Sequence, residues 1–588
     1  MQWCFVNTER IKTYLKHIFL GFIVVSALAW MFHDSINQRI QTAKDPYCFA
    51  DDVKQQIVPL MRYQDPQLFP KDYVVNYFAA CVPWAFKMLY KLYSYFDDPV
   101  NLSKSLPLVF YFLTALGLGI LAWRFGGWVP AWAATSFVLS SDIYMNCMAG
   151  GMPQAFAYPI LVWGLIAIEL GKINLLMIMT IIGAAFYPPS AIPLGLSLFL
   201  ILFLLPAHKR GQSAPWPILK RVYKLLLAAL LCLAFVIPSL IALKPYKPTI
   251  SYLDMNQYPE LEPKGCYDGT ELPPFHGFLE GILIYAPLTF MSSGQSWIDT
   301  THHWTFQNPN NSIALRKIIL IEIFLLVAVL GFGKLMTFSF SAQRIFIFLI
   351  AVWLSHIAAR LLAPLLYLPE QYEVYPIPIL LTLTLAVGSR YFATLFGRIG
   401  HSKLVQIAST FLICSICLIT LTGRGNKVNG QYPEIITNYH SLYDFIGQLP
   451  KDVMIAGWPT GPVNNIPYLC KRSAYITFES HPIFHEKYAL EMRKRMKHLI
   501  RAYFAIDLKQ ILKLRDKFKI THLIINTKHF KKCPKYFHPY EKWIKEAYKQ
   551  GPSQGFKILD LIPTCTVYQE ESCIILDLRK IPTSLIDQ

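Results

Sequence analysis

Long apolar runs without a charged residue recur along the chain, and three of them are about nineteen residues long. They cover positions 105–123, 225–243 and 404–422. Nineteen helical residues rise about 29 Å, close to the roughly 30 Å thickness of a bilayer's hydrocarbon core. These runs predict membrane-spanning helices. Buried helices of a soluble core are the alternative, and so many long uncharged runs in one chain argue against it.

Further apolar patterns raise the predicted number of spanning helices to eleven. The first run, 17–32, could be a signal peptide, but it is long for one and the His-Asp-Ser at 33–35 offers no small-residue cleavage site, which favours a retained helix. Seven more helices are predicted at about 128–141, 155–170, 173–187, 189–206, 317–333, 345–364 and 377–396. The two around Tyr187-Pro188-Pro189 could instead form one re-entrant hairpin.

Basic residues in the short loops predict which side of the membrane each end occupies. With a cytoplasmic N-terminus, alternation places the following residues inside: Arg124, Lys172, Lys209, Arg210, Lys220, Arg221, Lys224, Lys334, Arg344, Arg398 and Lys403. This agrees with the positive-inside rule. An odd number of helices then leaves residues 423–588 outside, in the extracytoplasmic space of a cell inner (plasma) membrane protein.

Composition supports this membrane assignment. The chain is 54% hydrophobic and 15% charged, with a mean hydropathy of +0.36, which is more apolar material than a soluble domain buries. Residues 423–588 carry 26 Lys and Arg against 15 Asp and Glu, a balance of +11 within the chain's net +19. That charge indicates a solvated surface or contact with anionic lipid head groups. No nucleic-acid partner is predicted.

Three outer segments are long enough to hold chemistry. In the first, residues 34–104, the pattern predicts an amphipathic helix over 51–62, then a loop, then a helical run rich in aromatic residues over 73–95. Residues 244–316 predict an irregular loop with a short apolar helix near 278–290. The third segment is 423–588, so we divide the chain into a transmembrane domain (1–422) and a soluble C-terminal domain.

The C-terminal domain has an α/β pattern. Predicted strands cover 453–457, 473–478, 521–526 and 573–578, and predicted helices cover 487–504, 508–518 and 541–550. The turn-rich exit Gly457-Trp458-Pro459-Thr460-Gly461-Pro462 is either a binding loop or an ordinary connection. The domain contains no phosphate-binding glycine loop and no zinc-ligand spacing. Cys565 and Cys573 could form a disulfide in an oxidising compartment. The predicted fold class is thus an α-helical polytopic membrane protein with a C-terminal α/β extracytoplasmic domain.

The candidate chemistry centres on Asp51-Asp52, at the start of a predicted helix less than twenty residues after the first spanning run. Acidic residues at such a position can serve as helix caps and as partners of the helix dipole. Their place at the mouth of a membrane domain favours a functional role instead.

With this pair the chain resembles the GT-C superfamily of membrane glycosyltransferases, which use polyprenyl-phosphate sugars. The layout matches over most of the chain: one helix, a long outer loop that opens with an acidic pair, about ten more helices and an outer domain. A second matching stretch is Arg360 followed by Pro369-Glu370-Gln371-Tyr372. The chain departs from the family in two ways. Its outer domain has no Trp-Trp-Asp motif, and Gln371 stands where some relatives carry a basic residue beside the tyrosine.

The resemblance implies inverting transfer of a hexose or pentose from a polyprenyl-phosphate-linked sugar to an extracytoplasmic acceptor. Asp51 would act as general base, and Asp52 would assist it or coordinate a divalent cation. The residues expected to bind substrate, chiefly the lipid phosphate, are Arg62, Lys264, His276, Arg360, Glu370 and Tyr372. Arg360 is the strongest candidate, because a charge near the end of an apolar helix is costly in lipid and usually faces the bundle interior; the alternative is that it extends to the interface. The pair His302-His303 could join a metal site or lie on a loop surface.

Two other functions are compatible with the sequence. A transporter or flippase of a lipid-linked or polar substrate would need inverted repeats or several ionisable residues near the bilayer midplane. Only Glu322, His356 and Arg390 lie well inside the runs, and no internal repeat is evident. A non-catalytic membrane scaffold would be favoured if Asp51 and Asp52 were engaged in capping bonds.

Overall fold

The computed structural model describes residues 43–205, 217–250, 331–334, 339–362, 371–399 and 434–582, apart from positions 437, 482, 483 and 550 and with a few single residues between these ranges. The predicted helices at 17–32, 278–290 and 404–422, and most of the one at 317–333, lie outside the described residues.

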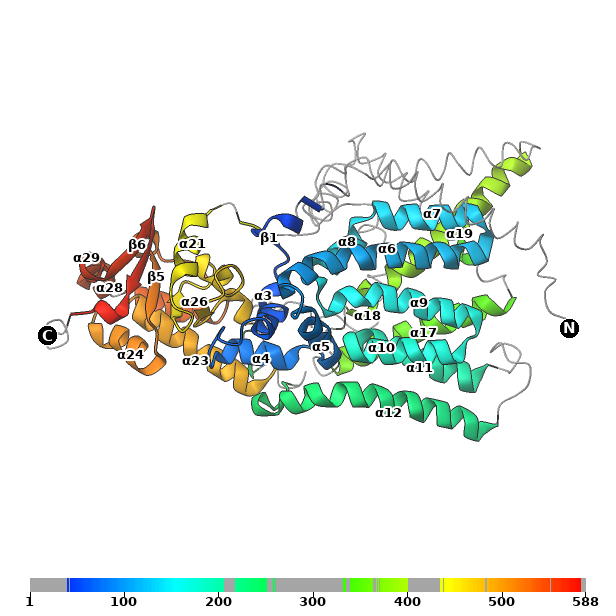
Figure 1. The fold of residues 1–588 in the computed structure, drawn as a ribbon, viewed down its shortest axis with the longest axis horizontal. Coiled ribbons are helices and arrows are strands. Elements are labelled where there is room, and N and C mark those ends of the chain that lie inside the picture. The colour runs from blue at the N-terminus through cyan, green and yellow to red at the C-terminus, as the bar shows by residue number, and fades with distance from the viewer. Residues whose placement is uncertain are drawn as a thin grey trace.

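A bundle of apolar helices forms one half of the molecule, and the C-terminal domain forms the other (Figure 1). The long helices of the bundle are α6 (Pro99–Gly126), α7 (Trp128–Ser140), α9 (Ala157–Leu170), α10 (Ile173–Phe186), α11 (Pro188–Leu204), α12 (Ile218–Ala242), α17 (Ser339–Leu361) and α19 (Pro376–Ile399). Each overlaps a predicted span. Within the described residues, five helical segments are long and apolar enough to cross a membrane, and α7, α10 and α11 are shorter apolar helices. The chain is a multi-pass membrane protein, and the total of eleven helices stays a prediction.

Helix α12 illustrates why the bundle needs lipid around it. It lies along the edge of the bundle (Figure 1), and Leu226 and Leu230 on it are 62% and 65% exposed. Apolar side chains gain free energy when they leave water. A continuous exposed apolar helix of 25 residues is therefore suited to a hydrocarbon surrounding.

Basic side chains gather at the end of the bundle that is far from the C-terminal domain. Arg124, in the last turn of α6, pairs with Glu169 near the end of α9, and the Arg344 guanidinium donates to the Glu169 carbonyl oxygen at 2.7 Å. At the other end of α6, Asp98 pairs with Lys471 of the C-terminal domain at 2.7 Å. Arg124 and Arg344 thus share one end, as alternation predicted, while the cytoplasmic identity of that end stays a prediction.

The first outer segment differs from the predicted single helix over 51–62. The chain forms the strand β1 (Cys48–Phe49), the short helix α3 (Val53–Gln56) and the 3-10 helix η1 (Val58–Tyr63). Pro59 has no N–H to continue α-helical bonding, and the Leu60 N–H bonds to the Ile57 carbonyl in 3-10 fashion at 2.8 Å. The aromatic run is likewise divided by Pro83 into α4 (Tyr73–Cys81) and α5 (Trp84–Tyr93).

Short elements complete this end of the bundle. They are α8 (Asp142–Met148), η2 (Ala149–Gly151), η3 (Pro153–Phe156), η5 (Lys244–Tyr246) and α18 (Gln371–Val374).

A five-stranded mixed sheet forms the centre of the C-terminal domain. Its strands are β3 (Met454–Gly457), β4 (Ser473–Ala474), β5 (His522–Asn526), β6 (Thr566–Glu570) and β7 (Cys573–Asp577), in the order β4-β3-β5-β7-β6. Strands β4, β3 and β5 are parallel, with Ile455 opposite both Ala474 and His522, and β7 pairs antiparallel with β5 and β6. The predicted strand 473–478 is shorter, because the chain turns into η11 (Phe478–Ser480) soon after it leaves the sheet.

Helices cover both faces of the sheet, so the domain has three layers. Leu523 and Ile525 of β5 pack in one core with residues of α23 (Glu486–Tyr503) and α24 (Leu508–Phe518), while Ile524 packs in another core with residues of α21 (His440–Gln448). This alternation is the strand period of two. The other helices are α22 (Ile466–Leu469), α25 (Lys528–Lys531), α26 (Tyr540–Lys549), α27 (Gly551–Gln554), α28 (Lys557–Asp560), α29 (Ile562–Cys565), η10 (Pro462–Asn465) and η12 (Leu578–Lys580).

The outer segments bind directly to the C-terminal domain. Strand β1 pairs antiparallel with β2 (Glu434–Ile435), at the entrance to that domain. From the second segment, the Ile250 N–H donates to the Phe484 carbonyl at 3.0 Å, and Glu260 accepts two hydrogen bonds from the Arg493 guanidinium at 2.7 and 2.6 Å. The first and second segments and the domain therefore form one assembly at one end of the bundle.

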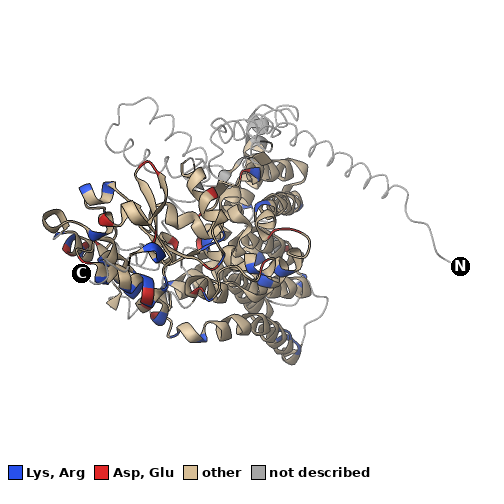
Figure 2. Cartoon of the chain, turned by 60° about the vertical axis from the view of Figure 1, so that its left-hand side comes forward, with Lys and Arg blue, Asp and Glu red and all other residues tan. Residues whose placement is uncertain are grey.

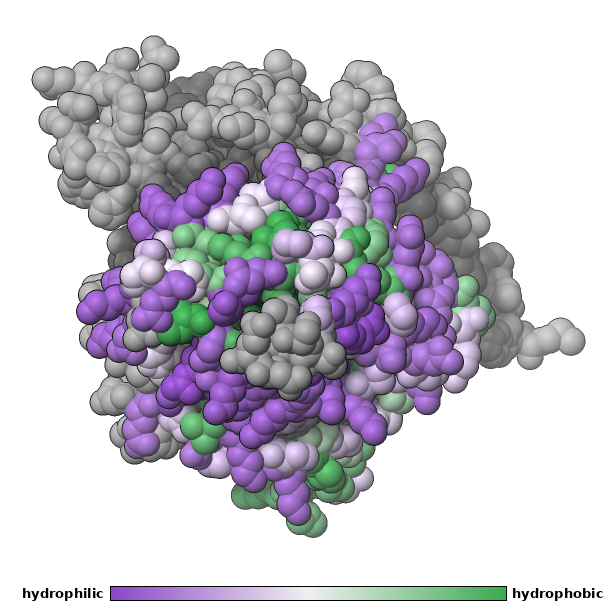
Figure 3. Space-filling view, turned by 90° about the vertical axis from the view of Figure 1, so that its left-hand side faces the viewer, coloured by the Kyte–Doolittle hydropathy of each residue, from purple (hydrophilic) through white to green (hydrophobic). Residues whose placement is uncertain are grey.

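Charged and polar residues are distributed unevenly between the two halves of the molecule, as expected for a helical bundle in a membrane and a domain in water. Charged residues are concentrated in the C-terminal domain, while much of the helical bundle carries none (Figure 2). The outward face of the domain is mostly hydrophilic, with an apolar band across its middle (Figure 3).

The possible disulfide between Cys565 and Cys573 is not formed. Both are buried free cysteines, in α29 and at the start of β7. Cys573 instead pairs with Glu570 across the hairpin of β6 and β7.

Candidate active site

The acidic pair is held at the junction of the bundle and the C-terminal domain. Ala50, Val53 and Ile57 on either side of it are buried, so the backbone of α3 is fixed by packing. Gly150 of η2 lies directly against this helix, with φ of 76°, and a Cβ there would stand 2.6 Å from a Val53 methyl group. This packing fixes the backbone that carries Asp51 and Asp52.

Asp51 is paired with a buried lysine. The Lys54 ammonium, which is 2% exposed, contacts the Asp51 carboxylate, and it donates to Asn465 Oδ1 of the C-terminal domain at 3.2 Å. A buried ammonium beside a carboxylate stabilises the anionic form of that carboxylate. Lys54 thus fixes the position of the Asp51 carboxylate.

A third carboxyl group, Glu479, joins the pair from a distant part of the chain. It is 6% exposed, its Oε2 accepts from Gln55 Nε2 at 2.7 Å, and its carboxyl group is hydrogen-bonded to that of Asp51. Burial, then Asp51, raises the pKa of Glu479 to about 8, against a partial opposing effect of Lys54. Burial and the neighbouring Asp51 carboxylate therefore favour the protonated form of Glu479.

The local fold aims Glu479 at this place. Glu479 lies in η11, which begins with a reciprocal capping box between Thr477 and Ser480. The backbone N–H of Glu479 donates to Asn464 Oδ1 at 3.2 Å. Sequence reasoning missed Glu479, because a single Glu between Phe478 and Ser480 has no spacing signal. Only its contact with Gln55, 424 positions away, reveals it.

Asp52 is the most exposed member of the cluster, although the Asp51 side chain is itself 39% exposed. Its residue is exposed, and its Oδ2 accepts from Gln154 Nε2 at 3.4 Å. Although part of the residue reaches the surface, protein packed around the carboxylate removes much of its water, and this burial, followed by the charge of Asp51, raises the pKa of Asp52 above its ordinary value. Asp52 stands at the N-cap of α3 but accepts no hydrogen bond from the helix backbone, so the capping alternative is wrong for this residue.

Arg360 and Tyr372 lie at the same end of the bundle as the acidic cluster. Two hydrogen bonds show this proximity. Asp52 accepts from Gln154, and Tyr158, four residues after Gln154 in the sequence, donates from its hydroxyl to the Val374 carbonyl of α18 at 3.1 Å. Helix α18 packs on the last turns of α17, which carry Arg360. Arg360 is 9% exposed, so it faces the interior of the bundle.

The remaining predicted site residues have other positions. Tyr372 is 1% exposed, and its hydroxyl donates to the Leu366 carbonyl at 2.9 Å, a contact that shapes the turn before α18. The Arg62 guanidinium donates to the carbonyls of Leu68 and Phe69 and to Asn76 Oδ1, so it fixes the loop before α4. Lys264, His276 and Glu370, like His302 and His303, lie outside the described residues.

The acidic cluster does not fit a divalent cation. In the described part of the chain, no group of three His, Cys, Asp or Glu side chains could hold a metal ion. The Lys54 ammonium already contacts the Asp51 carboxylate, and the Glu479 carboxyl group accepts from Gln55. The ligands of a dication must be deprotonated and free of competing cations.

No family model and no curated protein matches the sequence. Among solved structures, ArnT from Cupriavidus metallidurans aligns in its apo state over 95% of this chain and 99% of its own, with 10% identity and a TM-score of 0.48. Its structure bound to undecaprenyl phosphate aligns with a TM-score of 0.46 at 11% identity over the same shares of both chains. The apo oligosaccharyltransferase of Archaeoglobus fulgidus aligns over 87% of this chain and 70% of its own, with 11% identity and a TM-score of 0.49.

A further structure of the Archaeoglobus fulgidus enzyme, a complex with Zn and sulfate, aligns over 86% of this chain and 68% of its own, with a TM-score of 0.48 at 11% identity. These similar structures are GT-C glycosyltransferases, the superfamily that the sequence resembles. Identities near 10% and TM-scores below 0.5 transfer no residue roles, so the roles must come from the side chains of this chain itself.

Proposed function

We propose that this protein transfers a sugar from a polyprenyl-phosphate-linked donor to a hydroxyl or amine of an acceptor, at the cluster of Asp51, Asp52 and Glu479. The observation that carries the proposal is the convergence of three carboxyl groups in different states at one end of an apolar helical bundle. Asp51 is paired with a lysine, Glu479 is almost completely buried, and Asp52 lies at the surface, and the pKa values of Glu479 and Asp52 are both raised. A donor anchored in the bilayer would present its phosphate at this end.

In this reaction Asp52 is the general base. It is the most exposed carboxylate of the cluster, and its raised pKa makes it a better proton acceptor than an ordinary aspartate. The acceptor O–H or N–H gives its proton to Asp52 as the oxygen or nitrogen attacks the anomeric carbon. The bond between that carbon and the phosphate oxygen breaks, and polyprenyl phosphate leaves with the electron pair.

Asp51, Lys54 and Glu479 position and tune the base. The negative charge of Asp51 is one cause of the raised pKa of Asp52. Lys54 and the protonated Glu479 hold Asp51 in place through a contact on each side. This division of roles assigns the base to Asp52 and a positioning role to Asp51, because Asp51 is already engaged by a buried cation.

Arg360 is the proposed partner of the donor phosphate. Its burial at the acidic end of the bundle places a permanent positive charge away from water, where it stabilises a phosphate anion more strongly than at an open surface. A guanidinium can bind two phosphate oxygens at once. Arg62 is not part of this proposal, since it holds the loop before α4.

The acceptor side of the reaction is proposed to be extracytoplasmic. The basic end of the bundle would face the cytoplasm of a cell inner membrane, and the acidic cluster with the C-terminal domain would face outward.

The experiment is a transfer assay with the full-length protein in proteoliposomes that contain a panel of polyprenyl-phosphate-linked hexoses and pentoses. Transfer activity would release polyprenyl phosphate in amounts equal to the sugar lost from the donor. A matched assay follows the movement of a fluorescent lipid-linked sugar between leaflets. Lipid movement without any cleavage of the donor would contradict the proposal and identify a flippase.

A further inference from the structure

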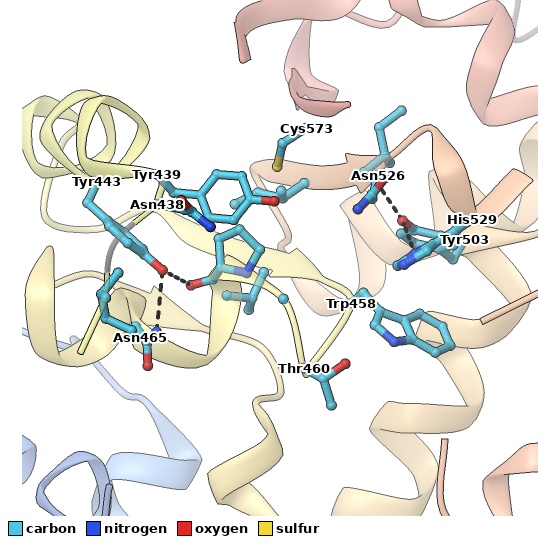
Figure 4. A pocket seen from close by; sticks show the side chains of 16 residues that line it. Asn438, Tyr439, Tyr443, Trp458, Thr460, Asn465, Tyr503, Asn526, His529 and Cys573 are labelled. Atoms are coloured by element: carbon cyan, nitrogen blue, oxygen red, sulfur yellow. Dashed lines mark hydrogen bonds between the residues drawn. The ribbon is translucent and has the colours of Figure 1, made fainter. Parts of the chain in front are cut away.

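The C-terminal domain contains a pocket of about 400 Å³ that the proposed transfer chemistry does not use (Figure 4). It lies where the adjacent parallel strands β3 and β5 end, with Trp458 and Thr460 following β3, Asn526 at the end of β5 and His529 in α25 just beyond it. From β3 the chain continues to β4 on one side, and from β5 it continues to β6 and β7 on the other. Such a reversal of direction opens a crevice at the carboxyl ends of the strands, where α/β domains commonly bind ligands.

The lining is polar but carries no formal charge. None of the sixteen residues that line the pocket is Asp, Glu, Lys or Arg, although the domain around it has a balance of +11. Burial lowers the pKa of His529 to about 4, so this side chain is also neutral at physiological pH. A phosphate or carboxylate ligand would find no countercharge in this lining, which favours an uncharged ligand.

The hydrogen-bonding groups of the pocket suit hydroxyl groups. The Tyr503 hydroxyl accepts from the Asn526 N–H at 2.9 Å and is hydrogen-bonded to His529 Nδ1 at 3.1 Å. The other ring nitrogen of the neutral imidazole, Nε2, can serve a ligand as a donor or as an acceptor, according to the tautomer. Across the pocket, the side chains of Asn438 and Thr460 supply both donors and acceptors and are exposed.

Aromatic rings make up much of the remaining wall. Tyr439 and Tyr443 stand on one side of the pocket, and Trp458 and Tyr503 stand on the other (Figure 4). Such rings offer an apolar face with a polar tip, so they can cover the C–H face of a ring whose edge carries hydroxyl groups.

We propose that this pocket binds a neutral saccharide unit, with its C–H faces against the aromatic walls and its hydroxyl groups paired with the amides, Thr460 and His529. Its volume lies in the range of roughly 300–1,000 Å³ that is usual for small-molecule sites. The turn-rich exit of β3, Gly457–Pro462, supplies one rim of the pocket and is thereby the binding loop.

One residue connects this pocket to the acidic cluster. Asn465 donates from Nδ2 to the Tyr443 hydroxyl at 3.4 Å inside the pocket and accepts at Oδ1 from Lys54, which contacts Asp51. If the proposed transfer reaction holds, a sugar in the pocket would lie on the acceptor side of it. The saccharide site itself does not depend on that reaction.

The experiment measures the binding of four neutral sugars to the full-length protein in nanodiscs, by saturation-transfer NMR and by calorimetry. The sugars are methyl glucoside, methyl galactoside, methyl mannoside and N-acetylglucosamine. We expect saturable binding of at least one neutral sugar, with glucuronate and glucose 1-phosphate bound more weakly. The double substitution Asn438→Ala with Thr460→Val should weaken binding about tenfold, because two exposed hydrogen-bonding groups are lost. Asn101→Ala, an exposed asparagine outside the pocket, should leave binding unchanged.

The same measurement on Asp52→Asn separates the two proposals, since sugar binding should persist when transfer is lost. Absence of saturable binding for every sugar would overturn the saccharide proposal, whatever the transfer assay shows. Tighter binding of the charged sugars, or equal binding by the double variant, would also overturn it.

Discussion

At the scale of single residues, the acidic cluster combines what a sequence pattern can predict with what it cannot. Asp51 and Asp52 were found from the sequence, because two adjacent carboxylates after the first apolar run stand out. Their division of labour was not predictable, since it depends on Lys54 and Glu479. Glu479 comes from a domain that begins hundreds of residues later, and only tertiary packing brings it to Gln55.

Glu479 makes a pH dependence of stability testable. Its pKa is about 8 in the folded protein, and an unfolded glutamate has a pKa near 4.5. The folded state therefore binds this proton more tightly, and its contribution to stability is complete below about pH 4.5 and is lost as pH rises through 8. Glu479→Gln, which keeps the neutral hydrogen bonds, should have a free energy of unfolding higher than that of wild type at pH 9, by an amount on the order of a few kcal/mol. It should therefore unfold at a higher temperature at that pH.

The measurement is thermal unfolding in detergent at pH 5, 7 and 9. Glu571→Gln, a substitution of an exposed glutamate, serves as the control and should unfold at the same temperature as wild type at each pH. A stability gap between wild type and Glu479→Gln that is the same at all three values would contradict the assigned protonation.

Arg360 carries a second prediction at this scale. If its guanidinium holds the donor phosphate, Arg360→Ala should weaken binding of a fluorescent polyprenyl phosphate at least tenfold, and Arg360→Lys should restore only part, because an ammonium lacks the fork geometry. Arg390 is the matched control. It is an exposed arginine on α19 beside Gly127, at the opposite end of the bundle, and Arg390→Ala should bind as wild type does. Equal affinity of Arg360→Ala and wild type would remove Arg360 from the site.

At the scale of elements, the apolar helices were predictable because each coincides with an apolar run, and five of them are long enough to cross a bilayer within the described residues. The short elements were not, because local chemistry and tertiary contacts decide them. Pro59 divides the expected helix over 51–62 into α3 and η1. The sheet of the C-terminal domain was predicted from its apolar strands. Helix α21 was missed because its N-cap residue, Tyr439, provides no side-chain cap and has a left-handed conformation that the sequence does not signal.

The contact between η2 and α3 provides the prediction for this scale. Gly150 has φ of 76°, and an added Cβ would stand 2.6 Å from Val53. Gly150→Ala should therefore destabilise the protein by about 1–3 kcal/mol, from backbone strain and overpacking together. Gly447→Ala in α21, where a Cβ meets nothing within 4 Å, should be neutral or stabilising, as expected for an exposed helix position. Thermal unfolding of both variants measures this, and equal stability would show that α3 is not held by close packing.

At the scale of the whole molecule, the cluster exists because the outer segments and the C-terminal domain bind one another. Strand pairing between β1 and β2, the Glu260–Arg493 contact and the Asp98–Lys471 pair all join distant parts of the chain. The sequence predicted that these parts share one side of a membrane, by alternation of eleven helices. It contained no signal for how they dock, since docking depends on complementary surfaces.

The predicted sidedness can be tested by cysteine labelling. In a background without native reactive thiols, which requires replacement of the exposed Cys81, a cysteine at Ser553 should react with a membrane-impermeant maleimide in intact cells. A cysteine at Ser213, within the basic segment between the predicted helices, should react only after permeabilisation. Labelling of Ser213 in intact cells would overturn the eleven-helix arrangement.

The central claim is that Asp52 removes a proton from the acceptor during sugar transfer. The most direct test is the single-turnover rate of polyprenyl phosphate release by Asp52→Asn, with donor affinity measured separately. Asn preserves the size of the side chain and can still accept from Gln154, but it cannot take the proton. We predict a rate that is about 10² to 10⁴ lower at unchanged donor affinity, with Asp516→Asn, an exposed aspartate of the C-terminal domain, as fast as wild type. A rate for Asp52→Asn equal to that of wild type would contradict the claim.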